Sequence, residues 1–226
     1  MTQTVKHHPS LNILEQFADG RLTAEIALVV SAHLDYCPHC QQLCRDMEAD
    51  FAGDLVSSPT TLAPSTSASQ MPDMLAKILA MPMLDEVKPV VTASHLEFGG
   101  QQFPLPHSVR RLSEQRSKWL TLGGIASCRL PSGEPHHLSL LVIGEKTEVP
   151  RHTHKGLEMT LVLAGEIEDE NGRYVAGDLI VASSSHTHTP RNVQTEPCLC
   201  LSVLSAPLEF TQGMTRLLNP FQRFFY

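Results

Sequence analysis

One histidine and two cysteines near the start of the chain have the spacing of metal ligands: His33, Cys37 and Cys40 form the motif H-x3-C-x2-C. In a helix, residues four apart lie on one face, so His33 and Cys37 can point at the same place. Cys40 follows after one short turn, and Pro38 suits the first position of a new helix. A thiolate near a helix N-terminus has a lowered pKa and binds zinc well, so the motif predicts a Zn²⁺ site.

Tetrahedral zinc needs a fourth ligand from outside this motif. The nearest candidates are His7 and His8 at the beginning of the chain, and spacing alone leaves both open. His39 and Cys44 lie beside the motif, but we expect them on exposed or core faces of a helix and not on the metal.

A second group of ligand types occurs late in the chain, where His152, His154 and Glu158 form the motif H-x-H-x3-E. On a strand, His152 and His154 point to the same face. Glu158 begins the next strand after a short turn and can meet them there. Imidazoles with a carboxylate suit Zn, Fe, Mn or Ni. We expect a divalent metal here, with Zn²⁺ preferred and Fe, Mn or Ni as alternatives.

These residues resemble the first of the two motifs that define the cupin barrel. The second motif is present as G-x5-S-x-S-x2-H-x3-N, with Ser183 and Ser185 where cupins usually carry Pro and Gly. This resemblance implies that His188 completes the ligand set of His152, His154 and Glu158. His186 is a nearby competitor for the same role.

Composition places the chain among ordinary globular proteins. It has 226 residues, 42% of them hydrophobic and 18% charged, which allows one large domain or two small ones. We expect a cytoplasmic protein without a membrane span, because the N-terminus is polar and no apolar run is long enough. The six cysteines are then expected as thiols or metal ligands. The net charge of −7 argues against direct nucleic-acid binding and favours a basic protein partner.

The elements that must position the ligands fall into three pieces. Residues 1–52 read as helices that begin after Ser10, after Thr23 and at Pro38. A flexible linker rich in Ser, Thr and Pro covers residues 53–70, and a short amphipathic helix follows at 72–81. A helix on such a tether must pack back on the first helices or onto a partner.

From residue 108 the pattern changes to short β-type runs separated by Gly, Pro, Asn and Asp, which favours a sandwich or barrel. The runs expected as strands are 118–122, 127–130, 138–143, 159–163, 173–175, 179–182 and 198–204. We therefore expect a multidomain protein with a small all-α zinc-binding domain at residues 1–84, an interdomain linker at 85–107, and an all-β cupin domain, a double-stranded β-helix, at 108–226.

The order of these parts resembles the ChrR family of cytoplasmic zinc-dependent anti-sigma factors over nearly the whole chain. Five segments carry the resemblance: HHPS at 7–10, LVVSAHL at 28–34, VPRHTHKGLEMTLVL at 149–163, HTP at 188–190 and PCLCL at 197–201. The family implies that the zinc domain binds an ECF-type sigma factor, with His8 as the fourth zinc ligand. It also implies that the cupin is not needed for inhibition. The cupin is needed to release the sigma factor on oxidative stress such as singlet oxygen or organic peroxides.

We therefore expect a regulator without enzymatic activity. Two other functions stay open. A metal-dependent cupin enzyme of the dioxygenase or isomerase class would use an open coordination position for substrate or O2. A third alternative is a cupin that binds a small molecule, joined to an unrelated zinc interaction module. Homodimerisation through the cupin also stays open, because cupins often dimerise. Core packing is expected for Cys198 and Cys200, and packing on the barrel or between domains for the apolar residues 217–226.

Overall fold

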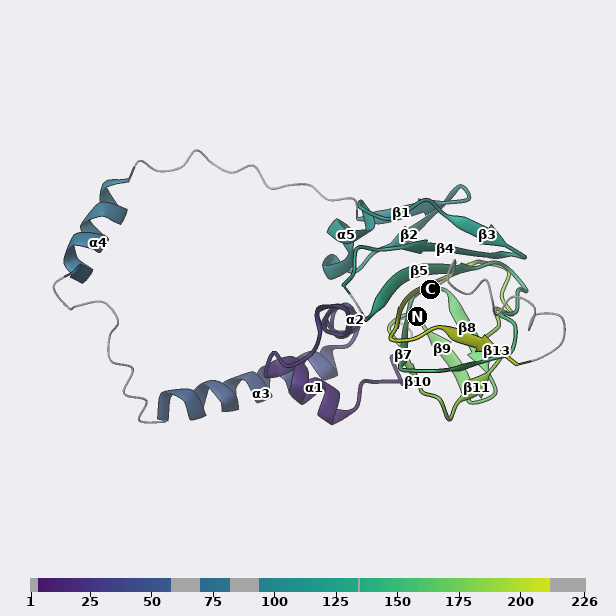
Figure 1. The fold of residues 1–226 in the computed structure, drawn as a ribbon, viewed down its shortest axis with the longest axis horizontal. Helices are drawn as coiled ribbons and strands as arrows, with labels where there is room; N and C mark the ends of the chain where they lie inside the picture. Colours follow the sequence, from purple (N-terminus) through teal and green to yellow (C-terminus); the bar gives the residue numbers. More distant parts are fainter. Residues whose placement is uncertain (1–3, 58–69, 82–93, 134, 212–226) are drawn as a thin grey trace. The chain divides into compact units, whose positions relative to one another are not determined.

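The computed structural model describes residues 4–57, 70–81, 94–133 and 135–211 (Figure 1). The chain divides into two compact units. The first combines Met1–Glu48 with Thr92–Tyr226, and the second is Ala49–Val91. The expected linker residues 58–69 and the apolar residues 217–226 lie outside the described residues.

Three helices follow one another at the start of the chain, as the sequence predicts: α1 (Leu11–Ala18), α2 (Ala24–Leu34) and α3 (Pro38–Ser57). Ser10 is the N-cap of α1, and its side chain accepts a hydrogen bond from the Ile13 amide. The chain leaves α1 through Gly20, which has a positive φ of 68° that glycine adopts without strain. Thr23 is the N-cap of α2 but makes no side-chain cap bond.

Helix α2 is apolar on nearly all sides and is buried accordingly. Val29, Val30 and His33 are fully buried, and the helix contacts α1, α5, β7 and β12. A helix with apolar residues all round needs cover on more than one side, and the β-rich part of the chain supplies it. Residues 1–48 therefore share one compact unit with the strands. The sequence predicts a boundary between two domains at residues 85–107, and the boundary between the two compact units differs from it. Independent folding of residues 1–84 stays a prediction.

The second unit contains the end of α3 and helix α4 (Gln70–Ala80). Helix α4 matches the helix expected at 72–81. Helix α3 continues to Ser57, so residues 53–57 are helical, and the linker prediction was wrong for this stretch. Within this unit, the apolar residues Met74, Leu75, Ile78 and Leu79 of α4 are each more than half exposed.

The C-terminal part is rich in β-strands, as predicted. Its main sheet has the order β10-β7-β12-β5-β4-β3, with every neighbouring pair antiparallel. A second sheet has the order β11-β6-β13, and β8 pairs with β9. The strand bounds are β3 Leu120–Leu122, β4 Ile125–Arg129, β5 His137–Ile143, β6 His152–His154, β7 Glu158–Ala164, β8 Glu166–Asp169, β9 Gly172–Val175, β10 Leu179–Ala182, β11 Thr187–His188, β12 Cys198–Leu204 and β13 Leu208–Phe210.

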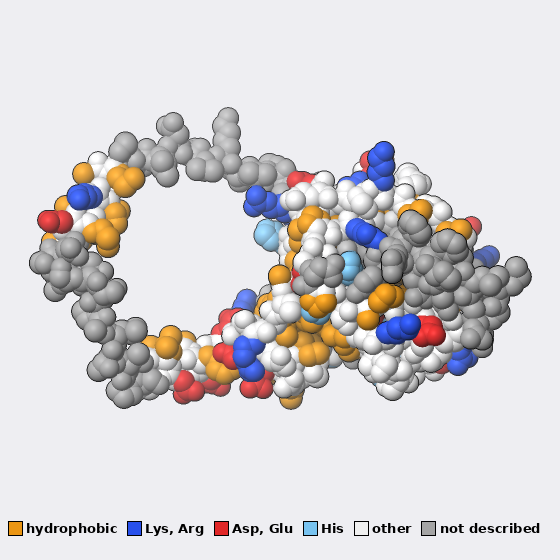
Figure 2. Space-filling view, in the orientation of Figure 1, with side chains coloured by type: hydrophobic (Ala, Val, Ile, Leu, Met, Phe, Trp, Pro, Cys, Tyr) orange, Lys and Arg blue, Asp and Glu red, His pale blue; other side chains and the backbone are white. Residues whose placement is uncertain are grey.

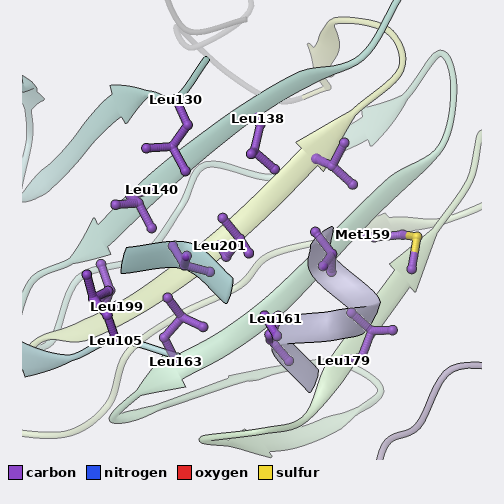
Figure 3. Packing of buried hydrophobic residues seen from close by; sticks show 14 of the residues in the cluster. Leu105, Leu130, Leu138, Leu140, Met159, Leu161, Leu163, Leu179, Leu199 and Leu201 are labelled. Carbon is purple, nitrogen blue, oxygen red and sulfur yellow. The ribbon is translucent and has the colours of Figure 1, made fainter. Parts of the chain in front are cut away.

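Strand β12 is buried along its whole length, because both of its faces are covered. Leu199 and Leu201 belong to the core shared with the helices (Figure 3). Side chains alternate along a strand, so Cys198 and Cys200 face the other way, into a separate core cluster. Both are free thiols with no exposed surface, which confirms their expected core position.

The segment expected as an interdomain linker, residues 85–107, is structured in its described part, and the prediction was wrong there. Strands β1 (His95–Phe98) and β2 (Gln101–Pro104) form a hairpin, and helix α5 (His107–Ser113) follows. Leu96, Phe103 and Val109 from these elements are buried in the core shared with α2. The strands were missed because each buries a single side chain, Leu96 or Phe103, next to polar residues, which is too weak a pattern to indicate a strand.

We predict that Asn192, the last residue of the second motif, stabilises the fold. Its buried Nδ2 lies 3.1, 3.0 and 2.8 Å from the carbonyl oxygens of Ile143, Gly144 and Glu196. Asn192→Ala should lower the free energy of unfolding by about 2–3 kcal/mol, because buried carbonyls lose their donor. Urea unfolding followed by circular dichroism measures this. Val193→Ala, at a neighbour that is 44% exposed, is the control and should change stability by less than about 0.5 kcal/mol.

Candidate metal centres

The first candidate centre joins the predicted motif to the start of the chain. His8, His33, Cys37 and Cys40 each offer a ligand atom, and these atoms all lie within 4.8 Å of one another. His33 comes from the last turns of α2, Cys37 from the turn before α3 and Cys40 from the first turn of α3. The Nδ1 atom of His8 lies 3.4 Å from both sulfur atoms. Three candidate ligands therefore come from one short segment, and His8, from the start of the chain, is the fourth.

The structure resolves the choice that spacing left open between the two N-terminal histidines. The ring of His7 lies against Tyr174, with 4.6 Å between ring centroids, and is not part of the cluster. His39 is exposed and also lies outside it, while Cys44 is buried one helical turn beyond Cys40. That neither residue binds the metal stays a prediction.

The hydrogen bonding of the His33 ring shows whether this residue can bind a metal. Its Nδ1 lies 2.8 Å from the carbonyl oxygen of Gly177 and must donate, because a carbonyl only accepts. Its Nε2 is buried and has no hydrogen-bond partner in the described part of the chain. Burial lowers the pKa of His33, which favours the neutral ring with a lone pair on Nε2. A histidine held this way by its other nitrogen is typical of metal ligands.

The two sulfur atoms fit the same conclusion. The Cys40 amide donates to the Cys37 sulfur at 3.4 Å, so this sulfur accepts a hydrogen bond from the first turn of α3. Burial and the nearby Cys37 raise the pKa of Cys40 to about 12, so a cation must replace its proton for a thiolate to form there. Two sulfur and two imidazole donors at these separations fit tetrahedral zinc.

The second candidate centre contains the four residues that the cupin resemblance implies. His152 and His154 lie on β6, Glu158 begins β7, and His188 ends β11. The Nε2 atom of His188 lies 3.1 Å from that of His152 and 3.2 Å from that of His154. His186 is exposed and hydrogen bonds with Ser183 instead, so His188 takes the position.

Two of these imidazoles are oriented from outside the cluster. His152 donates from Nδ1 to the Pro150 carbonyl at 2.9 Å, and the Nδ1 of His188 lies 3.0 Å from the Asp169 carboxylate. Each ring therefore turns Nε2 inward, as in metal sites where a second group fixes the ligand. Asp169 was not found from the sequence, since its spacing to Asn171 and Gly172 indicates a turn and nothing more.

Electrostatics in this cluster also fit a cation. Burial lowers the pKa of His152 to about 4, so this ring is neutral. Burial alone would raise the pKa of Glu158, but the contact with His154 and the other imidazoles outweigh it and lower that pKa to about 2. His154 Nδ1 and Glu158 Oε2 lie 2.9 Å apart, yet neither has an aligned hydrogen-bond partner among the described residues. A carboxylate with converging lone pairs favours a divalent metal.

A cavity of about 430 Å³ lies beside the second centre. Glu158 is on its wall, together with the polar side chains of Ser127, Ser139, Glu148 and Ser202. The other walls are mostly apolar and come from β3, β4, β5, β12 and β13: Leu120, Leu122, Ile125, Leu141, Leu204, Leu208 and Phe210. Such a cavity fits a small, largely apolar molecule that reaches the metal position.

Comparisons with known proteins match both parts of the chain. The family model of the ChrR cupin-like domain matches residues 112–207, and a zinc-finger family model matches residues 12–41. The chain is 34% identical to the anti-sigma-E factor ChrR of Cereibacter sphaeroides, over 97% of this chain and 99% of the relative. A solved structure, Rhodobacter sphaeroides SigE in complex with the anti-sigma ChrR, matches with a TM-score of 0.70 and 28% identity, covering 89% of this chain and 100% of that chain.

We predict that the N-terminal cluster binds one zinc ion. Cys37→Ser should reduce the zinc content of the full chain by about one equivalent, because it removes one of four ligands. His39→Ala, beside the cluster but outside it, is the control and should keep the wild-type content. Elemental analysis after dialysis measures both variants. Equal zinc content in wild type and Cys37→Ser would contradict the assignment.

We predict a separate metal in the second centre. His188→Ala should remove this metal while leaving the N-terminal zinc in place, because the two clusters share no residue. Asp169→Asn should weaken binding by roughly tenfold, since it loosens the orientation of His188. Titration of the metal-free chain with Zn²⁺ and with Mn²⁺ measures the affinities. His186→Ala is the matched control, and a loss of metal from it instead of from His188→Ala would show that the wrong histidine was chosen.

Proposed function

The chain belongs to the ChrR family of anti-sigma factors, and from this premise we propose that it sequesters an ECF-type sigma factor through its N-terminal zinc-binding part. It releases the sigma factor on an oxidative-stress signal, such as singlet oxygen or an organic peroxide, that is sensed with the cupin. The observation that carries the proposal is the convergence of His8, His33, Cys37 and Cys40 on one point, in a chain similar over its full length to an anti-sigma factor.

Zinc in the N-terminal cluster would supply folding energy, because it ties three separate segments of the chain together. His8 anchors the N-terminal segment, His33 the end of α2, and Cys40 the start of α3. A thiolate ligand also offers an oxidation route, since conversion of a cysteine to sulfenate or disulfide removes a ligand. Loss of the ion would therefore loosen the helices that hold the partner.

Exposed helix surfaces support a protein partner. On α4, Met74, Leu75, Ile78 and Leu79 are spaced so that they share one helix face, and all are exposed (Figure 2). Near the end of α3, Leu55 and Val56 are 73% and 86% exposed. Exposed apolar helix faces of this kind mark interaction sites. An amphipathic helix can bind by laying its apolar face into a groove of the partner.

Charge on the same helices suits a sigma factor. Helix α3 carries exposed carboxylates at Asp46, Glu48, Asp50 and Asp54. They complement the basic surfaces that a sigma factor uses to contact promoter DNA and polymerase. With a net charge of −7 for the whole chain, we propose that this protein contacts the sigma factor and not nucleic acid. No helix in the described part of the chain is long and apolar enough to span a membrane, and we propose the cytoplasm, where sigma factors act, as its location.

A second candidate function is favoured by the cavity beside the second centre. The Glu158 carboxylate lies on the wall of an apolar cavity of about 430 Å³, an arrangement in which a metal-dependent cupin enzyme would hold its substrate. The same cavity would serve a regulator as the place where a peroxide or other small apolar molecule reaches the metal. Consumption of O2 with a defined substrate would favour the enzyme.

We predict that the full chain captures a sigma factor from its native cytoplasm and that capture depends on the N-terminal cluster. Tagged wild-type chain should retain an ECF-type sigma factor, identified by mass spectrometry. Cys37→Ser should lose it, because the helices are no longer tied together. Cys44→Ser, which changes a cysteine of the same helix outside the cluster, is the control and should retain it. A zinc-loaded wild-type chain that captures no sigma factor would contradict the proposed function.

A further inference from the structure

The tight turn between β9 and β10 lies against the N-terminal cluster. This turn contains Gly177 and Asp178, which are separated in sequence by more than 140 residues from the ligands they approach. The carbonyl oxygen of Gly177 accepts the hydrogen bond from His33 Nδ1 at 2.8 Å. The group that fixes the ring of one N-terminal ligand is therefore part of the β-rich half of the chain.

Asp178 holds the segment that carries a second ligand. Its side chain is fully buried, and Oδ1 accepts hydrogen bonds from the amides of Lys6 at 2.6 Å and His7 at 2.8 Å. The Leu179 amide donates to the His7 carbonyl at 3.0 Å. Hydrogen bonds to a buried carboxylate are about twice as strong as those between neutral groups. They fix the two residues immediately before His8.

Asp178 also belongs to its own turn, since its Oδ2 accepts a hydrogen bond from the Val175 amide at 2.9 Å. One carboxylate therefore joins the end of β9 to the N-terminal segment. A shift of this turn must move both groups of hydrogen bonds together.

Close packing at Gly177 makes this contact rigid. A Cβ atom at this position would lie 2.6 Å from Val5 Cγ2 and 2.7 Å from Tyr36 Cβ, and its φ is +95°, so glycine is required here. The Tyr36 hydroxyl donates to the Leu163 carbonyl on β7 at 2.8 Å. Tyr36 immediately precedes Cys37, so a third ligand is also tied to the sheet.

Strand β10 connects this turn to the second centre. It begins next to Asp178 and ends at Ala182, which pairs with Glu158 on β7. The chain then continues through a short loop to His188. Strand β10 therefore runs from the turn beside the N-terminal cluster to the residue that pairs with Glu158 of the second centre.

We propose that the Gly177–Asp178 turn is a positioning element of the N-terminal cluster, through which the β-rich half of the chain sets the metal affinity of that cluster. The inference rests on the proposed zinc binding at the N-terminal cluster. It adds that a structural change near the second centre, passed along β10 to this turn, lowers the zinc affinity of the N-terminal cluster. Coupling of this kind is reciprocal, so zinc in the N-terminal cluster also holds the turn and the start of β10 in place.

The test titrates Co²⁺ into the metal-free full chain and follows the charge-transfer absorption between thiolate and Co²⁺. This signal reports the N-terminal cluster alone, because the second centre has no sulfur ligand. Zinc affinity is then measured by competition with a chromophoric chelator. Asp178→Ala should bind zinc at the N-terminal cluster about tenfold more weakly and alter the Co²⁺ spectrum, in line with the cost of losing a group that orients a metal ligand. Asp178→Asn should shift both in the same direction by less.

Glu25→Ala is the matched control. Glu25 on α2 accepts a hydrogen bond from the Gly133 amide at 2.7 Å, so it also joins a helix to the β-rich half, but it orients no ligand. Its spectrum and zinc affinity should match those of wild type. If circular dichroism shows that Asp178→Ala does not fold, the Co²⁺ spectrum and zinc affinity of Asp178→Asn provide the test. Wild-type spectrum and affinity in the folded Asp178 variants would overturn the inference, whereas a wild-type chain without thiolate absorption would instead overturn the proposed zinc site.

Discussion

Burial of α2 is the constraint on which the rest of this structure depends. The helix carries apolar side chains on almost every side, and Val29, Val30, Ala32 and His33 have no exposed surface. The helices α1 and α5 cover part of it, and β7 and β12 cover the rest. Because His33 lies in this interface, the candidate metal ligands of the N-terminal motif are fixed in relation to the sheet. The apolar helix α2, packed on the sheet, thus positions one residue of the N-terminal cluster.

The two candidate centres are built by the same physical rule. In each, a short motif presents three candidate ligands from one local segment, and a residue from elsewhere in the chain completes the set. Backbone carbonyls or carboxylates outside the cluster orient the imidazoles, as Gly177 does for His33 and Asp169 for His188. Each cluster leaves buried nitrogen or oxygen atoms without partners in the described part of the chain. A bound cation removes that cost, since unpaired buried polar groups are unfavourable.

The surfaces that we propose for partner binding and for sensing differ in character. The end of α3 and all of α4 expose apolar side chains and carboxylates, which suits a protein partner. The β-rich part instead encloses the second set of candidate metal ligands and a mostly apolar cavity, which suits a small molecule.

Local patterns in the sequence determined the helices, the main strands and both metal motifs. The spacing of His33 to Cys40 and of His152 to Glu158 works within one or two elements, where helix and strand periodicity fix direction. Only the tertiary structure decided that His8 and not His7 joins the first cluster, that His188 and not His186 joins the second, and that residues 95–104 form a hairpin. It alone revealed Asp169 and Asp178, whose partners lie 19 and up to 172 residues away. Contacts over such distances depend on how elements pack and on strand register, and neither leaves a periodic signal along the chain.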